Sequence, residues 1–235
     1  MTEERRGAQS QVRPCTGESM RTVSMAACAG MLWVILGGGV YASDSWQYWN
    51  ALAFDYTMNE NTAVRISSEQ RWLDGMSYFG LYNVMVVPSV KLTKQVSLGA
   101  GYRLERSEKD ELWATENRLL VPLTSMWSFQ GWTVQWRNQL EYRDLQIRDR
   151  WRIRERIAIN RPVLIGRLEV RPFVSEELFY DLTLGQRNQN RAAVGVGLPL
   201  SRNMEVNLFY ISRADRGAFD WSSIQALGTE WVFKF

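Results

Sequence analysis

The sequence predicts an all-β fold, namely a transmembrane antiparallel up-and-down β-barrel of about 10–12 strands. The C-terminal segment, from Gln225 to Phe235, is the most informative because its residues alternate with a period of two. The apolar face of this strand carries Leu227, Trp231, Phe233 and Phe235. The opposite face carries Gly228, Glu230 and Lys234, and only Val232 breaks its polar pattern. An aromatic-rimmed strand of this kind is typical of a strand that lies between lipid and a polar interior.

An export signal is predicted at the N-terminus, in residues 1–42. The apolar run from Met31 to Val40 follows the basic Arg21, and Val40-Tyr41-Ala42 offers the small residues that a signal peptidase reads, so we expect cleavage before Ser43. The run is too short for a transmembrane anchor. The residues before Met20 are polar and of both charge signs, which makes Met20 a candidate for the true start.

Residues 43–235 are predicted to form a single barrel domain. Both cysteines precede this domain, so it has no thiol for a disulfide or a metal. Without the four Arg and three Glu of the signal region, 24 basic and 22 acidic residues remain. This near balance argues against a nucleic-acid partner, because the basic patches that bind nucleic acid would give an imbalance.

The barrel domain contains one predicted strand after another and no predicted helix. The strand ranges are Trp46–Tyr56, Thr62–Trp72, Tyr78–Val90, Val96–Leu104, Leu112–Leu123, Trp132–Arg143, Trp151–Ile159, Arg167–Leu178, Asn190–Leu198, Met204–Ser212 and Gln225–Phe235. This makes eleven, but single-chain bacterial barrels have even strand numbers, so ten or twelve strands are expected.

The connections between these strands alternate in length. The short ones, which we assign to the periplasmic side, are at 92–94, 130–131 and 201–203. The longer ones, which we assign to the outside, are at 107–111, 144–149, 181–189 and 214–223.

A soluble β-sandwich or a lipocalin-like cup would also have half-polar strands. In those folds the outward faces carry Lys and Glu with few aromatic residues. Here the polar face is instead rich in Arg and Glu, and the apolar face is aromatic near the strand ends, as membrane girdles are. We therefore favour a barrel in the bacterial outer membrane.

The polar faces of the strands are predicted to converge on the interior of the barrel. The charged residues expected to line it are Arg65, Glu69, Arg71, Arg103, Glu105, Glu116, Arg118, Arg137, Glu141, Arg143, Arg152, Arg154, Arg156, Glu169, Arg171, Glu177, Arg191, Glu205 and Glu230. One interpretation is a ladder of ion pairs that fills a narrow interior, in which Glu141 and Glu169 pair with the row from Arg152 to Arg156. The other is an open path whose arginine row favours anions.

The composition argues against catalysis, because the chain has no histidine. Barrel-shaped phospholipases, acyltransferases, deacylases and proteases typically use a histidine as a general base. No catalytic, cofactor-binding or metal-binding residue is predicted, since no Cys or His cluster and no phosphate-binding Gly-rich loop is present. The favoured function is a structural or binding barrel that is not an enzyme. A small anion-preferring channel and an enzyme that does not need histidine are the alternatives.

The order of several short motifs resembles an outer-membrane family catalogued as domain of unknown function 2490. These motifs are Trp46, Glu69 to Arg71, Gly99 to Arg103, Glu116 to Arg118, Arg150 to Arg156, Pro172 to Glu177 and Asn207 to Tyr210. The resemblance covers the whole chain after the signal region and implies an outer-membrane barrel with no assigned activity. The expected partners are outer-membrane lipid and the barrel-assembly machinery, which would read the terminal strand of a monomer.

Overall fold

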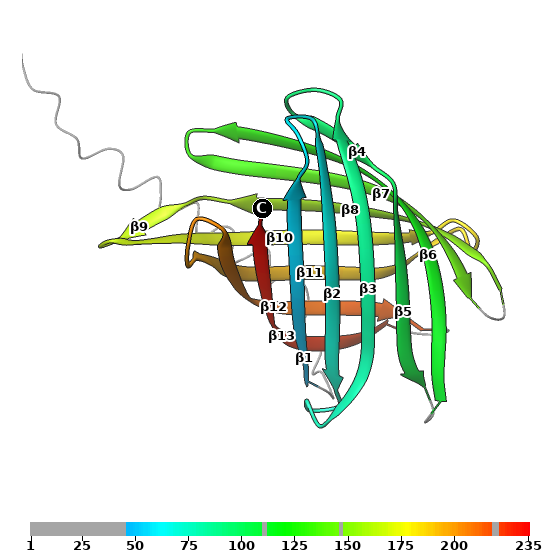
Figure 1. Cartoon of the computed structure of the whole chain (residues 1–235). Coiled ribbons are helices and arrows are strands. Elements are labelled where there is room, and N and C mark those ends of the chain that lie inside the picture. The colour runs from blue at the N-terminus through cyan, green and yellow to red at the C-terminus, as the bar shows by residue number, and fades with distance from the viewer. Residues whose placement is uncertain (1–45, 110–111, 146–147, 218–220) are drawn as a thin grey trace, which may run out of the picture. The chain divides into compact units, whose positions relative to one another are not determined.

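The computed structural model describes residues 46–109, 112–145, 148–217 and 221–235, and the predicted signal peptide therefore lies outside the described residues. The described chain is all-β (Figure 1). Its strands are β1 (Trp46–Thr57), β2 (Thr62–Leu73), β3 (Tyr78–Lys91), β4 (Val96–Gly99), β5 (Gly101–Lys109), β6 (Leu112–Phe129), β7 (Trp132–Leu145), β8 (Arg150–Asn160), β9 (Val163–Ile165), β10 (Leu168–Asp181), β11 (Gln186–Pro199), β12 (Met204–Arg216) and β13 (Trp221–Lys234). From Trp46 onward, the described chain has no helix that is long and apolar enough to cross a membrane.

These strands close into a barrel of eleven strands. β4 and β5 both lie between β3 and β6 and act as one interrupted strand, whereas the short β9 pairs only with β10. The barrel closes where β1 pairs with β13 in parallel, and the other pairs around it are antiparallel. The expectation of an even number was therefore wrong. With an odd number of alternating strands the first and the last run in the same direction, and a parallel ladder can still satisfy their backbone groups.

The interruption between β4 and β5 lies where both neighbouring strands carry a proline. Ala100 lies outside both strands, and its N–H donates to the Pro88 carbonyl at 3.1 Å. A Cβ on Gly101 would lie 2.6 Å from the carbonyl oxygen of Val86. Only glycine allows the two backbones to approach so closely. The predicted continuous strand over Val96–Leu104 is divided here because Pro88, opposite Ala100, and Pro122, opposite Gly99, have no N–H to donate to this segment.

Successive residues of each strand alternate between the inside and the outside of the barrel. In the closing strand, Leu227 and Phe235 are exposed, whereas Ala226 and Val232 are buried. A small apolar core lies on the inward face, where Trp49, Ile211 and Ala226 pack against Ala193 and Phe209. Most of the remaining buried side chains of the barrel are polar or charged.

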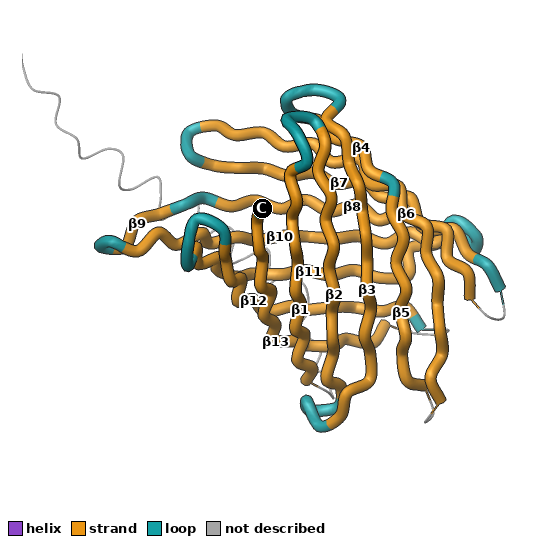
Figure 2. The backbone as a smooth tube through the Cα atoms, viewed as in Figure 1, coloured by secondary structure: helices purple, strands orange, loops and turns teal. Residues whose placement is uncertain are grey.

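The connections predicted to be short and those predicted to be long lie at opposite ends of the barrel. The turns after β3, β6 and β11 share the end where β13 finishes, and the connections after β2, β5, β7, β10 and β12 share the other end (Figure 2). At the first end the β6–β7 and β9–β10 hairpins extend beyond their neighbours. The turn between β6 and β7 is only Gln130-Gly131, whose φ angles of 49° and 80° suit a tight hairpin.

The predicted alternation of short and long connections was wrong. All four connections predicted to be long are shorter than predicted, because the strands continue into them: only 110–111, 146–149, 182–185 and 217–220 lie between strands, and these are no longer than 92–95 and 200–203 at the other end. β10 continues to Asp181 and β11 begins at Gln186, so that only four residues (182–185) connect them. Similarly, β12 continues to Arg216 and β13 begins at Trp221. Polar residues in these segments keep the two-residue alternation, and they therefore remain in strands although their composition resembles that of loops.

Candidate functional site: the ion pairs on the inward face

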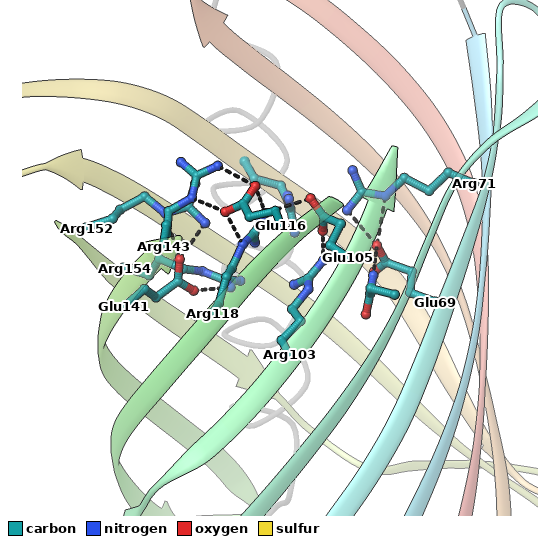
Figure 3. A network of polar contacts seen from close by, with 12 residues as sticks. Glu69, Arg71, Arg103, Glu105, Glu116, Arg118, Glu141, Arg143, Arg152 and Arg154 are labelled. Carbon is teal, nitrogen blue, oxygen red and sulfur yellow. Dashed lines mark hydrogen bonds and ion pairs between the residues drawn. The ribbon is translucent and has the colours of Figure 1, made fainter. Parts of the chain in front are cut away.

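The strand register brings charged residues of neighbouring strands side by side on the inward face. Arg156 lies between Arg137 of β7 and Glu177 of β10, and Glu177 lies next to Arg191 of β11. The same alternation places all of the charged residues that the sequence predicted to line the interior on this one face of the sheet. Hydrogen bonds and ion pairs group many of them into two clusters (Figure 3).

The first cluster crosses β5, β6 and β7. Arg118 contacts Glu105 at 2.6 Å and Glu116 at 2.6 Å, and all three side chains are buried. Arg143 binds the same Glu116 carboxylate through two N–H groups, at 2.5 and 2.9 Å. Arg103 pairs with Glu105 on its other side. Each carboxylate thus accepts from two guanidinium groups, which is the planar fork geometry that arginine suits.

The second cluster crosses β7, β8 and β10. Glu141 is completely buried, with an exposed fraction of 0%, and accepts from Arg152 at 2.5 and 2.8 Å and from Arg154 at 2.8 Å. Arg154 also donates to Glu177 at 2.8 Å and so connects two carboxylates. Arg137 reaches the same Glu177 oxygen at 2.8 Å. Buried charges such as these are tolerated only because they are paired and hydrogen-bonded.

The expected pairing of the arginine row with Glu169 was wrong. Glu169 is paired with Leu164 of β9 in the ladder, and its carboxylate contacts Arg171 at 2.7 Å. The carboxylate of β10 that reaches the row is Glu177, because the register places it directly opposite Arg156. Glu169 lies eight residues earlier in β10, before Phe173, where the pairing of β10 with β8 begins.

Two buried aromatic rings contact several of the arginines. The guanidinium of Arg71 lies 3.6 Å from the ring centroid of Trp49, whose exposed fraction is 2%. Arg152 and Arg154 lie 5.0 and 4.9 Å from the ring of the buried Phe179. Cation–π attraction compensates part of the repulsion between like charges that crowd on one face.

Sequence reasoning missed several charged members of the inward face, among them Asp55, Asp181, Arg213 and Asp215. Arg213 pairs with Asp215 at 2.7 Å, and Asp181, with an exposed fraction of 0%, lies 3.6 Å from Arg150. Asp181 and Asp215 fall in segments that were predicted as loops, and Arg213 directly follows the predicted end of its strand at Ser212. Continuing the two-residue alternation from Glu177 and from Glu205 would have found these three.

A cavity of about 180 Å³ lies on the inward side of the sheet. Its charged lining residues are Glu69, Arg137, Arg154, Arg156, Glu177, Arg191 and Glu230. Trp49, Phe173 and Phe209 contribute aromatic surface. Among residues 46–235, so far as the structure describes them, no group of three or more His, Cys, Asp or Glu side chains could hold a metal ion.

Together these features define a closed β-barrel whose inward face carries buried ion pairs and whose outward face is apolar. The family model described as protein of unknown function (DUF2490) matches residues 46–222, and the chain belongs to this family. The match confirms the resemblance seen in the sequence motifs. No curated protein matches the chain.

Proposed function

We propose that this protein is an integral β-barrel of the bacterial outer membrane. The observation that carries the proposal is the reversed polarity of the barrel. Large apolar side chains such as Leu119, Val121 and Ile157 are exposed, whereas charged ones such as Glu141 and Arg118 are buried. A soluble barrel would need the opposite arrangement, because apolar surface of this extent drives association in water. In lipid the same surface is favourable, and a closed barrel leaves no backbone edge unpaired.

Aromatic residues near the two ends of the barrel support this location. Trp72, Phe79 and Trp113 form a cluster near one end, with ring centroids 5.6 and 6.0 Å apart. At the other end, Tyr56 stacks on Phe235 with centroids 4.9 Å apart. Aromatic girdles at both interfaces are typical of outer-membrane barrels.

We further propose that the barrel is a structural or binding protein rather than an open channel. Arg152 and Arg154, two members of the arginine row, are committed to Glu141 and Glu177 at ion-pair distance. Paired guanidinium groups that cross the interior occupy the space of a conduction path and leave little uncompensated charge to select ions. This supports the ion-pair ladder over the anion-preferring channel.

The proposed role is not catalytic. A general base would have to be a carboxylate, since the sequence has no histidine. The buried candidates Glu105, Glu116 and Glu141 each accept hydrogen bonds from two arginines, so their oxygens are occupied by the protein itself.

We propose that the assembly machinery recognises the terminal strand and that the barrel is a monomer. Phe235 is the last residue, and its backbone is tied to β1: its N–H donates to the Asp55 carbonyl, and its own carbonyl accepts from Thr57, both at 2.9 Å. Closure of the barrel therefore includes the very end of the chain.

Two measurements test these proposals. Fractionation should recover the full chain in the outer membrane, with a band that migrates differently on gels before and after heating. Recovery as a soluble periplasmic protein would overturn the location. Planar-bilayer recordings of the purified barrel should show no steady conductance, whereas a stable anion-selective conductance would favour the channel.

A further inference from the structure

The inward cavity is large enough for a small solute. At roughly 30 Å³ per water molecule, its volume of about 180 Å³ corresponds to about six waters. Its walls come from β1, β2, β7, β8, β10, β11, β12 and β13, and they combine aromatic surface with charged groups. Such a mixture of apolar walls with a few convergent polar groups is typical of a ligand site.

The arginines of this cavity have hydrogen-bonding capacity that the protein does not use. Arg156 makes no ion pair with a carboxylate among the described residues, and its polar contact is with Ser175 Oγ at 3.4 Å. The Nε atoms of Arg137, Arg154 and Arg191 are buried, and no described group accepts a hydrogen bond from them. Arg154 itself is more than nine-tenths buried. Buried donors without an acceptor are costly and therefore rare in folded proteins.

Two of the three carboxylates of the cavity are, in contrast, already paired with arginine, and the third, Glu230, accepts a hydrogen bond from an amide. Glu177 accepts from Arg137 and Arg154 at 2.8 Å, Glu69 accepts from Arg71 at 2.8 Å, and Glu230 accepts from Asn207 at 3.0 Å. Four arginines face three glutamates across this space. The unused capacity is thus on the cationic side, around Arg156.

We propose that this cavity binds a small oxyanion, with a carboxylate, phosphate or sulfate group, through Arg156 and the neighbouring arginine N–H donors. A guanidinium presents parallel donors that match the oxygens of such a group. Nearby aromatic surface excludes water and strengthens the attraction. The site uses interior residues only, so it does not depend on whether the barrel lies in a membrane.

The test uses the full chain, expressed in a Gram-negative host and purified in detergent. Its melting temperature is measured against increasing inorganic phosphate or acetate, with chloride at matched ionic strength as the reference. We expect a saturable rise with at least one oxyanion beyond the effect of chloride, because a ligand that binds only the folded state stabilises it. Absence of a saturable rise with both oxyanions would overturn the proposal.

Variants assign the effect to the cavity. Arg156→Gln should weaken the apparent affinity at least about tenfold, since it removes the uncommitted charge. Arg213→Gln is the matched control, because Arg213 is an inward arginine that pairs with Asp215 and does not line the cavity. If Arg156→Gln does not assemble, Arg156→Lys keeps the charge but loses the fork, and it should also weaken binding. Equal binding in the wild type and in the Arg156 variant that assembles would refute the site. A soluble barrel that still shows the shift would overturn the membrane proposal alone.

Discussion

Replacing Glu141 by Gln should destabilise the barrel strongly, because it removes the most enclosed charge of the second cluster. Arg154 would keep Glu177 as a partner, at 2.8 Å. Arg152, whose side chain is 7% exposed, would lose the one carboxylate that it contacts among the described residues. Leaving a desolvated charge without its partner costs roughly 3–5 kcal/mol. We therefore expect a loss of this order in the free energy of unfolding.

Urea unfolding of the purified barrel measures this loss. With a dependence of about 2 kcal/mol per molar urea, a loss of about 4 kcal/mol moves the midpoint down by about 2 M. Glu169→Gln is the control, because Glu169 and its partner Arg171 are 41% and 34% exposed in their side chains. Breaking that exposed pair should cost only about 0–1 kcal/mol. Equal midpoints for the two variants would refute the claim that enclosure makes these ion pairs important.

Two further predictions concern the chain end and the arginine row. Deleting Phe235 removes a stacked ring and two backbone hydrogen bonds to β1, and it should reduce the amount of assembled barrel in the outer membrane several-fold. The control Lys234→Gln breaks only an exposed pair worth about 0–1 kcal/mol and should leave that amount unchanged. An equal loss of assembled barrel in both variants would contradict this prediction. Replacing Arg152, Arg154 and Arg156 together by Gln should lower the melting temperature rather than alter ion selectivity, because it leaves the buried Glu141 without an ion-pair partner. A triple variant with normal melting and no change in conductance would count against both interpretations of the arginine row.

Local alternation explains how much of the fold could be predicted from sequence. A period of two depends only on residues within one strand, and it placed Leu227 and Trp231 of the closing strand on the face opposite to Gly228 and Glu230. The same rule assigned the arginine row of β8 to a single face. Most predicted strands therefore agree with the structure to within a few residues.

Charge pairing could not be predicted, because it depends on contacts between strands. The count of eleven strands made from sequence was right, and only the even-number rule replaced it by ten or twelve. An odd number of alternating strands closes in parallel and an even number antiparallel, so the even-number rule also excluded the parallel closure between β1 and β13. Pairing depends on register, and the register shifts at Arg71/Trp72 and at Phe179/Tyr180. From sequence alone, Glu169 and Glu177 are equivalent partners for the arginine row, and only the length of the connection through β9 distinguishes them.

The parallel closure also explains a group of polar side chains on the outward face. Parallel pairing is slightly weaker per residue than antiparallel pairing, so this junction needs other stabilising contacts. Tyr48 bonds to Thr229 at 2.7 Å, Thr229 donates to Asn50 at 2.9 Å, and Asn50 donates to Gln70 at 3.0 Å. This chain of hydrogen bonds crosses from β13 to β2. Each of these outward-facing polar groups therefore has a hydrogen-bond partner, which lowers the cost of placing it in an apolar environment. A register slip of two residues would separate all of these partners, and this chain of hydrogen bonds therefore fixes the alignment of β1 with β13.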